Sequence, residues 1–178
     1  GGIAAYKIAG LVSTLVQEGA TVDVLMTDAA KKFITPLTFS SLTARPVFDD
    51  QWIQIDGHEP QHIKIANSLS ILLIAPCTMD MLAKLSHGRT NDAVSLVVSA
   101  IDRETTPVIL APSMNTVMMK QPATQRNIAM LKDDGFTVLD SEYGWQACRA
   151  VGEGRMPEEE TLLETIKQTL SRKNEISY

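Results

Sequence analysis

The chain has 178 residues, which suits one domain with a full hydrophobic core and is too short for two ordinary domains. Hydrophobic residues make up 44% and charged residues 21% of the sequence, a composition typical of a folded protein and outside the range of disorder. The formal net charge is -5 and no stripe of lysine or arginine is present, which argues against nucleic-acid binding. We therefore expect a single domain over residues 1–178 and a small-molecule ligand.

The sequence predicts neither a membrane anchor nor a disulfide framework. No apolar run approaches the roughly 20 residues of a membrane span, and the opening stretch lacks the basic-then-apolar order of a signal peptide. We therefore expect a cytoplasmic protein that makes no membrane contact. Its two cysteines, Cys77 and Cys148, have no Cys or His partners at zinc spacing, so we expect no metal site and interpret each thiol as packed or reactive.

Helical and strand patterns alternate along the chain. Expected helices cover residues 3–16 and 28–33, begin at Pro36 and His62, and then cover residues 79–85, 92–100, 122–132 and 156–170. Expected strands cover residues 21–26, 69–76, 107–112 and 136–140, and residues 46–61 are predicted to be mostly loop. The strands at 69–76 and 107–112 are short, continuous apolar runs, as in parallel strands buried on both faces. The pattern predicts an α/β fold with a parallel sheet covered by helices, whose ligands bind where the strands end.

Two predicted helix starts are candidate ligand sites, and each has an ordinary alternative. Gly1-Gly2-Ile3 leaves free backbone N–H groups at the positive end of the first helix, where a phosphate could bind, although glycine before a helix is also common in turns. His62 is a candidate general base, because proton transfer near neutral pH is most often done by histidine, although a lone histidine is more often a surface or capping group.

The stretch after the second buried strand offers another candidate. The side-chain amide of Asn115 provides both a donor and an acceptor to a ligand, and the alternative is that it caps a following helix. Met114, Met118 and Met119 are predicted to belong to the core or to a pocket wall. Asp92 is predicted to be the N-cap of the helix that follows it.

Cys148 lies shortly before Gly152 and Gly154, with Arg149 and Arg155 nearby. A free cysteine is usually a small buried hydrophobic residue. Nearby positive charge lowers the pKa of a thiol, and a glycine-bearing loop can carry a thiol onto a bound ligand when it closes. The residues alone leave both interpretations open.

Six stretches carry a resemblance to a known family, in this order: GGIAAYK, MTDAAKKFITPL, HIKIA, APCTMDMLAKLSHGRTNDAVS, APSMNTVMM and ACRAVGEGRM. The chain resembles the flavin-containing cysteine decarboxylases from Gly1 to about Leu170. The branch it resembles most acts on 4'-phosphopantothenoylcysteine in coenzyme A biosynthesis. The resemblance implies a flavodoxin-like, Rossmann-like three-layer α/β sandwich that binds FMN and assembles as trimers or dodecamers, with active sites at subunit contacts.

The resemblance also implies a reaction. The flavin takes a pair of electrons from the cysteine end of the substrate, the resulting thioaldehyde loses CO2, and the enethiolate is then reduced to 4'-phosphopantetheine. In that reaction His62 corresponds to the catalytic base, Asn115 to the residue that holds the cysteine moiety, and Cys148 to the proton donor for the enethiolate.

Further residues correspond to binding positions of that family. Those that correspond to FMN contacts are Gly2, Ile3, Thr27, Thr78 and Ser113. Those that correspond to substrate contacts are Asn115, Met118, Gly152, Gly154, Arg155 and Met156. Arg155 is the candidate partner of the substrate phosphate, because its planar guanidinium suits bidentate binding. In this interpretation Gly152 and Gly154 let the Cys148 loop close on the substrate.

The chain departs from the family pattern at several points. The family has a strand ahead of the position of Gly1, and without it the sheet would lack a central member. Arg149 stands where glycine is usual, which puts a positive charge beside Cys148. The ligase domain commonly fused to such enzymes has no counterpart in the sequence.

Two other functions remain open. A peptidyl-cysteine decarboxylase of the same fold would not need Cys148. A non-catalytic regulatory binding protein of the same fold would not need His62, Asn115 and Cys148 together. Because the chain has all three residues, we expect the full reaction on 4'-phosphopantothenoylcysteine.

Overall fold

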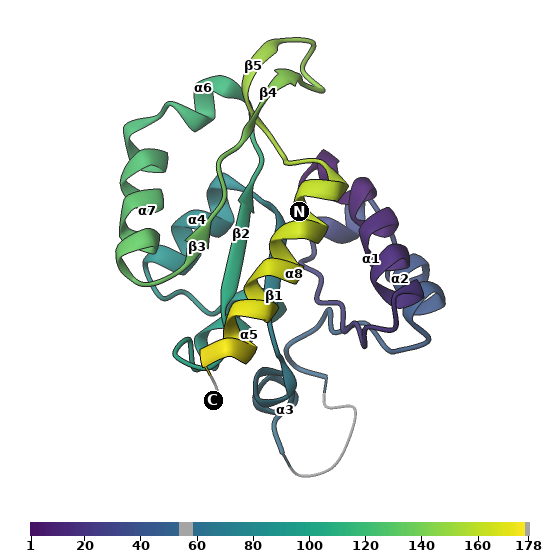
Figure 1. Cartoon of the computed structure of the whole chain (residues 1–178). Helices are drawn as coiled ribbons and strands as arrows, with labels where there is room; N and C mark the ends of the chain where they lie inside the picture. The colour runs from purple at the N-terminus through teal and green to yellow at the C-terminus, as the bar shows by residue number, and fades with distance from the viewer. Residues whose placement is uncertain (54–58, 177–178) are drawn as a thin grey trace.

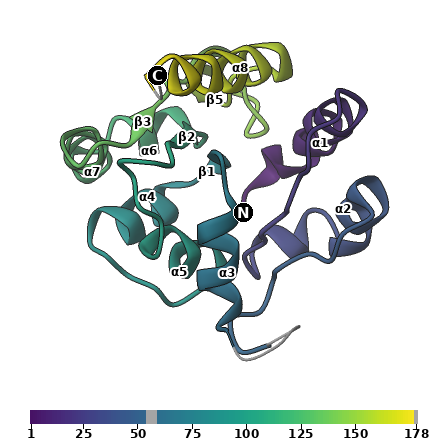
Figure 2. The same ribbon diagram turned by 60° about the horizontal axis from the view of Figure 1, so that its bottom comes forward.

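A parallel three-stranded sheet lies at the centre of the computed structural model, which describes residues 1–53 and 59–176 (Figure 1). Its strands are β1 (Leu72–Cys77), β2 (Val108–Pro112) and β3 (Thr137–Val138), paired in the order β1-β2-β3. Helices lie on both faces, with α8 on one and α4 and α5 on the other (Figure 2). This arrangement confirms the predicted α/β fold with a buried parallel sheet.

The helices, in chain order, are η1 (Ile3–Lys7), α1 (Ile8–Gln17), η2 (Ala30–Lys32), α2 (Pro36–Thr43), α3 (Gln61–Ser68), α4 (Met79–Ser86), α5 (Ala93–Ser99), α6 (Thr116–Met119), α7 (Pro122–Asp133) and α8 (Glu159–Ile176). Each predicted helix is present, the one over residues 28–33 as the short 3-10 helix η2 and the one over residues 3–16 as the 3-10 helix η1 followed by α1. The predicted N-cap is also confirmed, because the carboxylate of Asp92 accepts hydrogen bonds from the backbone N–H groups of Val94 and Ser95.

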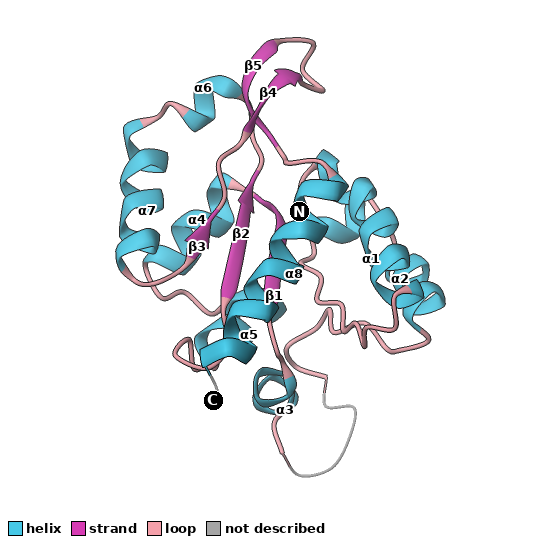
Figure 3. Cartoon of the chain, viewed as in Figure 1, coloured by secondary structure: helices cyan, strands magenta, loops and turns pink. Residues whose placement is uncertain are grey.

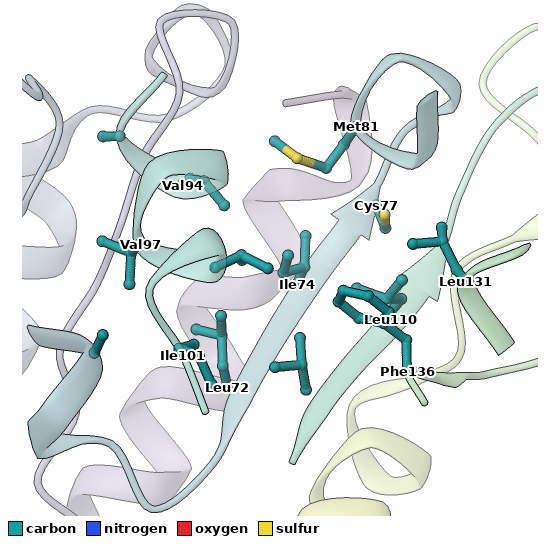
Figure 4. Close-up of a cluster of buried hydrophobic side chains, with 14 of the residues drawn as sticks. Leu72, Ile74, Cys77, Met81, Val94, Val97, Ile101, Leu110, Leu131 and Phe136 are labelled. Atoms are coloured by element: carbon teal, nitrogen blue, oxygen red, sulfur yellow. The ribbon is translucent and has the colours of Figure 1, made fainter. Parts of the chain in front are cut away.

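The surroundings of β1 explain why its sequence is a continuous apolar run. Leu72 and Ile74 point into a core cluster with side chains of α3, α4, α5 and α7, shown in Figure 4. Leu73 and Ala75 point to the opposite face, where they pack with side chains of α1 and α8. Since successive side chains of a strand point to opposite faces, a strand covered on both sides must be apolar throughout.

The predicted strand over residues 21–26 is wrong. In the described part of the chain its ladder pairing is limited to an isolated parallel bridge between Leu25 and Phe48. Between this segment and β1 lies a cavity of about 650 Å³, lined in part by Val24 and Leu73. An alternating pattern cannot form a strand without a neighbour for its backbone hydrogen bonds. Residues 46–53 form the predicted loop apart from this bridge, and residues 54–58 of the same prediction lie outside the described residues.

A second, antiparallel sheet was not predicted. It consists of β4 (Glu142–Trp145) and β5 (Val151–Arg155), which form a hairpin beyond the carboxyl end of the main sheet (Figure 3). Glycine is depleted in strands and weakens the strand pattern, and β4 contains Gly144 while β5 contains Gly152 and Gly154. The hairpin carries Cys148 in its turn.

Candidate functional site

The residues that correspond to flavin contacts gather where the strands of the main sheet end. Thr78 follows β1 directly, and the backbone N–H of Ser113, which follows β2, donates a 2.9 Å hydrogen bond to the carbonyl oxygen of Cys77. Gly2 lies beside Thr78, because a Cβ added at Gly2 would be 3.5 Å from the Cγ2 of Thr78. The carboxyl ends of parallel strands lie at the same edge, so the chain segments after β1 and β2 meet there.

Thr27 joins this edge through its neighbour Ala30. The backbone N–H of Ala30 donates to the Thr27 hydroxyl at 3.1 Å. Gly1 lies so close to the backbone of Ala29 and Ala30 that a Cβ at Gly1 would overlap it. The contacts therefore bring Gly2, Thr27, Thr78 and Ser113 of the predicted set to one edge, and the fifth member, Ile3, is the exposed residue after Gly2.

This edge has the chemical groups that a phosphate-bearing flavin needs. Gly2 precedes η1 without a side-chain cap, so backbone N–H groups of the first turn are left to bind a ligand at the positive end of the helix. The hydroxyl of Thr78 accepts a 3.2 Å hydrogen bond from the backbone of Met81 and still has its own O–H to donate. The residues present therefore fit the cofactor that the resemblance implies.

Asn115 is confirmed as a helix cap, and its side chain also contacts Cys148. Its Oδ1 accepts a 2.8 Å hydrogen bond from the backbone N–H of Val117 and so caps α6. Its Nδ2 donates to the Sγ of Cys148 at 3.1 Å. The β4–β5 hairpin brings these two predicted catalytic residues together from segments that are 33 residues apart.

Cys148 is an exposed free thiol with a lowered pKa. A hydrogen bond from the backbone N–H of Ala150 lowers the pKa most, and the hydrogen bond from the Asn115 amide lowers it further. These hydrogen bonds, and not the predicted charge of Arg149, are the cause. By contrast, burial raises the pKa of Cys77 to about 12, so Cys77 is the packed thiol.

Gly152 and Gly154 lie in β5 with their backbone buried against the turn before α6. A Cβ at Gly152 would overlap the side chain of Thr116, and a Cβ at Gly154, whose φ is +115°, would overlap the carbonyl of Met114. In this structure the glycines allow close approach of the two segments. The expectation that they also let the Cys148 loop close on a substrate stays a prediction.

The remaining residues predicted to contact the substrate differ in their exposure. Met118 is 42% exposed in α6, close in sequence to Asn115. Arg155 forms an ion pair with Glu158. Met156 is 2% exposed and belongs to the core cluster that includes Leu162. Met118 is therefore open to a ligand, whereas Met156 is covered in this conformation.

His62 lies apart from Asn115 and Cys148. It is the second residue of α3, and α3 lies toward the amino end of β1, at the opposite end of the sheet from α6 and the hairpin (Figure 1). The side chain of His62 is half-buried. One chain therefore brings together two of the three predicted catalytic residues.

One residue of the site was missed. Gln146 lies two positions before Cys148 and is 8% exposed, and its side chain contacts both the hairpin and the turn before α6. A lone glutamine carries no pattern that marks it in a sequence. Its partners become visible only when the hairpin is folded.

Two features are absent from the described part of the chain. Across residues 1–53 and 59–176 no three His, Cys, Asp or Glu side chains are grouped so that they could hold a metal ion. No helix in the described part of the chain is both long enough and apolar enough to cross a bilayer.

Comparison with known proteins identifies related sequences. The family model described as Flavoprotein matches residues 1–171. The coenzyme A biosynthesis bifunctional protein CoaBC of Vibrio parahaemolyticus is 42% identical over 168 residues, which are 94% of this chain and 41% of that protein. The chain thus spans about two fifths of the length of these bifunctional relatives. A probable phosphopantothenoylcysteine decarboxylase of Streptococcus mutans is 39% identical over 170 residues, 96% of this chain and 94% of that protein.

A solved structure supports the same relationship. It is a mutant of PPC decarboxylase in complex with pantothenoylaminoethenethiol, and it matches with a TM-score of 0.86 and 26% sequence identity. The match covers 96% of this chain and 94% of that chain. The predicted fold and the predicted family are both confirmed.

Proposed function

The chain belongs to the Flavoprotein family, and from that premise we propose that it is an FMN-dependent decarboxylase that converts 4'-phosphopantothenoyl-L-cysteine to 4'-phosphopantetheine in coenzyme A biosynthesis. The observation that carries the proposal is the contact between the Asn115 amide and the Cys148 thiol. The similarity to a probable phosphopantothenoylcysteine decarboxylase over 96% of the chain supports the choice of substrate.

FMN supplies reversible electron acceptance from the cysteine end of the substrate. Backbone N–H groups of Gly2 and Ile3 and the hydroxyls of Thr27, Thr78 and Ser113 would hold the cofactor at the edge where the strands end. Free N–H groups at a helix start suit its phosphate, and hydroxyl donors suit its oxygen and nitrogen acceptors.

Asn115 holds the cysteine moiety of the substrate, and its capping bond keeps it in place. Because its Oδ1 is engaged by Val117, its Nδ2 is fixed as the group that faces outward, and it already donates to a sulfur atom. The substrate's cysteine end offers the same kind of acceptor. Asn115 therefore orients the reacting group without a change in its own conformation.

Cys148 returns a proton to the enethiolate that remains after CO2 is lost. A thiol with a lowered pKa gives up its proton more readily, because the hydrogen bonds from Ala150 and Asn115 stabilise the thiolate that is left. These bonds therefore favour Cys148 as a proton donor, provided that it is protonated when the enethiolate forms.

We further propose that the protein is a cytoplasmic homotrimer or dodecamer and that a second copy supplies His62 as the base. His62 and the Asn115–Cys148 pair lie at opposite ends of one chain, so a contact between two copies is needed to bring them together (Figure 1). Closed symmetric assemblies make such shared sites in every subunit.

Residues 1–178 form a single FMN-binding decarboxylase domain in this proposal, completed by a strand ahead of Gly1. The cavity between β1 and residues 21–26 has Gly1 among its lining residues, so a preceding segment would enter it directly. A chain extended by a strand-forming apolar segment should have a higher melting temperature. An unchanged melting temperature and an unfilled cavity would contradict this part of the proposal.

The direct test is an assay of the purified protein with FMN and 4'-phosphopantothenoylcysteine. The proposal predicts release of CO2 and formation of 4'-phosphopantetheine, and bound FMN with neither product would refute it. A peptidyl-cysteine decarboxylase would instead act on a peptide with a C-terminal cysteine and would keep full activity in Cys148→Ser. A regulatory binding protein would give no turnover with either substrate.

A further inference from the structure

The side chain of Gln146 connects the β4–β5 hairpin to the turn before α6. Its Nε2 donates to the carbonyl oxygens of Glu153 at 2.8 Å and Met114 at 3.3 Å. Its Oε1 faces the backbone N–H of Thr116 at 3.3 Å and the Thr116 hydroxyl at 3.4 Å. A buried amide with these partners holds two segments that are about thirty residues apart in sequence.

Gln146 also forms the base of the turn that carries Cys148. Its backbone N–H donates to the carbonyl of Ala150 at 2.8 Å, and its carbonyl accepts from the N–H of Arg149 at 2.9 Å. The Cys148 thiol donates to the Oε1 of Gln146 at 3.6 Å. The side-chain amide that holds the two segments together is therefore in contact with the reactive thiol as well.

The other half of the hairpin has its own attachment to the same turn. The backbone N–H of Met114 donates to the carbonyl of Gly154 at 2.9 Å, and the Thr116 hydroxyl donates to the carbonyl of Glu153 at 2.7 Å. These bonds hold β5 without help from Gln146. Loss of the Gln146 amide should therefore free the Cys148 turn from the turn before α6, while β5 and the β4 strand paired with it stay in place.

We propose that Gln146 is a positioning residue whose side-chain amide holds the Cys148 turn against the turn before α6, so that the Cys148 sulfur stays within hydrogen-bond distance of Asn115. The catalytic consequence rests on the proposed function, but the positioning itself does not. Without the amide, the carbonyl of Met114 and the N–H of Thr116 lose a buried partner, and opening of the turn to water becomes favourable.

The test measures the alkylation rate of Cys148 by iodoacetamide at a fixed pH below the thiol pKa, without substrate or turnover. The Asn115 amide favours the thiolate, so Asn115→Ala should slow alkylation roughly fivefold, as expected for the loss of one hydrogen bond. Gln146→Leu should slow it by a similar factor, because the sulfur moves away from Asn115. Increased access does not offset this, since Cys148 is already exposed.

The decisive comparison is the double variant. In the Gln146→Leu background, Asn115→Ala should change the rate less than about twofold, because the contact it removes is already lost. If Asn115→Ala slows alkylation equally in both backgrounds, the Asn115–Cys148 contact does not depend on Gln146 and the proposal fails.

The buried thiol of Cys77 reports on folding in the same experiment. A folded variant should have one reactive thiol and an unfolded variant two, because Cys77 is 0% exposed in the native chain. If Gln146→Leu exposes Cys77, Gln146→Met replaces it as a variant of similar length. Exposure of Cys77 in both variants would show that Gln146 maintains the fold itself, which would also overturn the proposal.

The decarboxylase assay supplies a second readout. Gln146→Leu should release CO2 in the first turnover and form 4'-phosphopantetheine more slowly, with a larger change in kcat than in KM, because a displaced thiol affects the final protonation. Loss of CO2 release together with a large rise in KM would point to a substrate-binding role instead. An inactive wild-type protein would refute the proposed function and leave the alkylation result valid.

Discussion

Asn115 uses its two side-chain polar atoms for different tasks, and one of them adds to the effect of the Ala150 N–H in lowering the pKa of Cys148. The oxygen holds the start of α6, while the nitrogen donates to the sulfur. A side chain with one polar atom anchored in the fold has few orientations left for the other atom. The anchoring therefore makes Asn115 a rigid donor, as catalytic positioning requires.

The pH profile of Cys148 alkylation tests this donor. In the native chain the midpoint should lie below the ordinary thiol value of 9.0, because the hydrogen bonds from Ala150 and Asn115 stabilise the thiolate. Asn115→Ala should move the midpoint up. Asn115→Ser is the matched control, since serine can still cap α6 but cannot reach the sulfur, and it should give the same upward shift. A midpoint that moves with Ala and not with Ser would assign the effect to the cap.

Arg149 occupies a backbone conformation that favours glycine, with φ of +64°. Left-handed backbone costs a residue with a Cβ about 1–2 kcal/mol, so Arg149→Gly should be more stable to thermal unfolding than Arg149→Ala by about 1 kcal/mol. Both variants remove the charge, so the comparison isolates the strain. Neither should move the alkylation midpoint of Cys148, because the charge of Arg149 does not cause its lowered pKa. Equal stability of the two variants would argue against strain at this position.

The β4–β5 hairpin is the element that assembles the site, and its packing depends on the absence of side chains in β5. Gly154 combines a φ of +115° with close contact to the Met114 carbonyl, so Gly154→Ala should destabilise the protein by about 1–3 kcal/mol. Gly144→Ala in β4 is the control, because its Cβ would meet only the flexible Arg155 side chain, and it should cost much less. Denaturant unfolding measures both, and equal losses would contradict the close-approach explanation.

Some helices and strands can be recognised from their own residues, and these were predicted correctly. Elements that form only because of contacts with another segment were not predicted. β1 and β2 are continuous apolar runs because both of their faces are covered, so the residue types alone indicate that these strands are buried. The hairpin was missed because glycine is ordinarily a turn residue, and its role in β5 depends on the position of Thr116 and Met114. The strand over residues 21–26 failed because pairing is a property of two segments.

The same distinction applies to the site. The resemblance assigned Asn115 and Cys148 to one reaction, and the fold brings their side chains to 3.1 Å within one chain. Gln146 has no such signal, since its partners are mostly backbone groups that lie at other positions of the folded chain. The resemblance grouped His62 with the other catalytic candidates. The order of motifs along a sequence does not tell which copy of the chain supplies each residue to a site.

At the scale of the whole molecule, the separation of His62 from Cys148 predicts complementation between two inactive variants. Co-expression of His62→Asn with Cys148→Ser should restore product formation to about a quarter of the wild-type level, because random pairing of the chains leaves that share of shared sites intact. Each variant expressed alone is the control. The absence of any restoration in mixed assemblies would show that one chain supplies both residues and would contradict the proposed shared site.

The central claim, that this chain decarboxylates 4'-phosphopantothenoylcysteine with FMN and a proton from Cys148, is tested most directly by one spectrum. FMN-loaded Cys148→Ser protein is followed by absorbance without oxygen after the substrate is added. The account predicts that the flavin absorbance bleaches and stays bleached while CO2 is released, because only the final protonation needs the thiol. A flavin spectrum that remains oxidised, with no CO2 released, would contradict it.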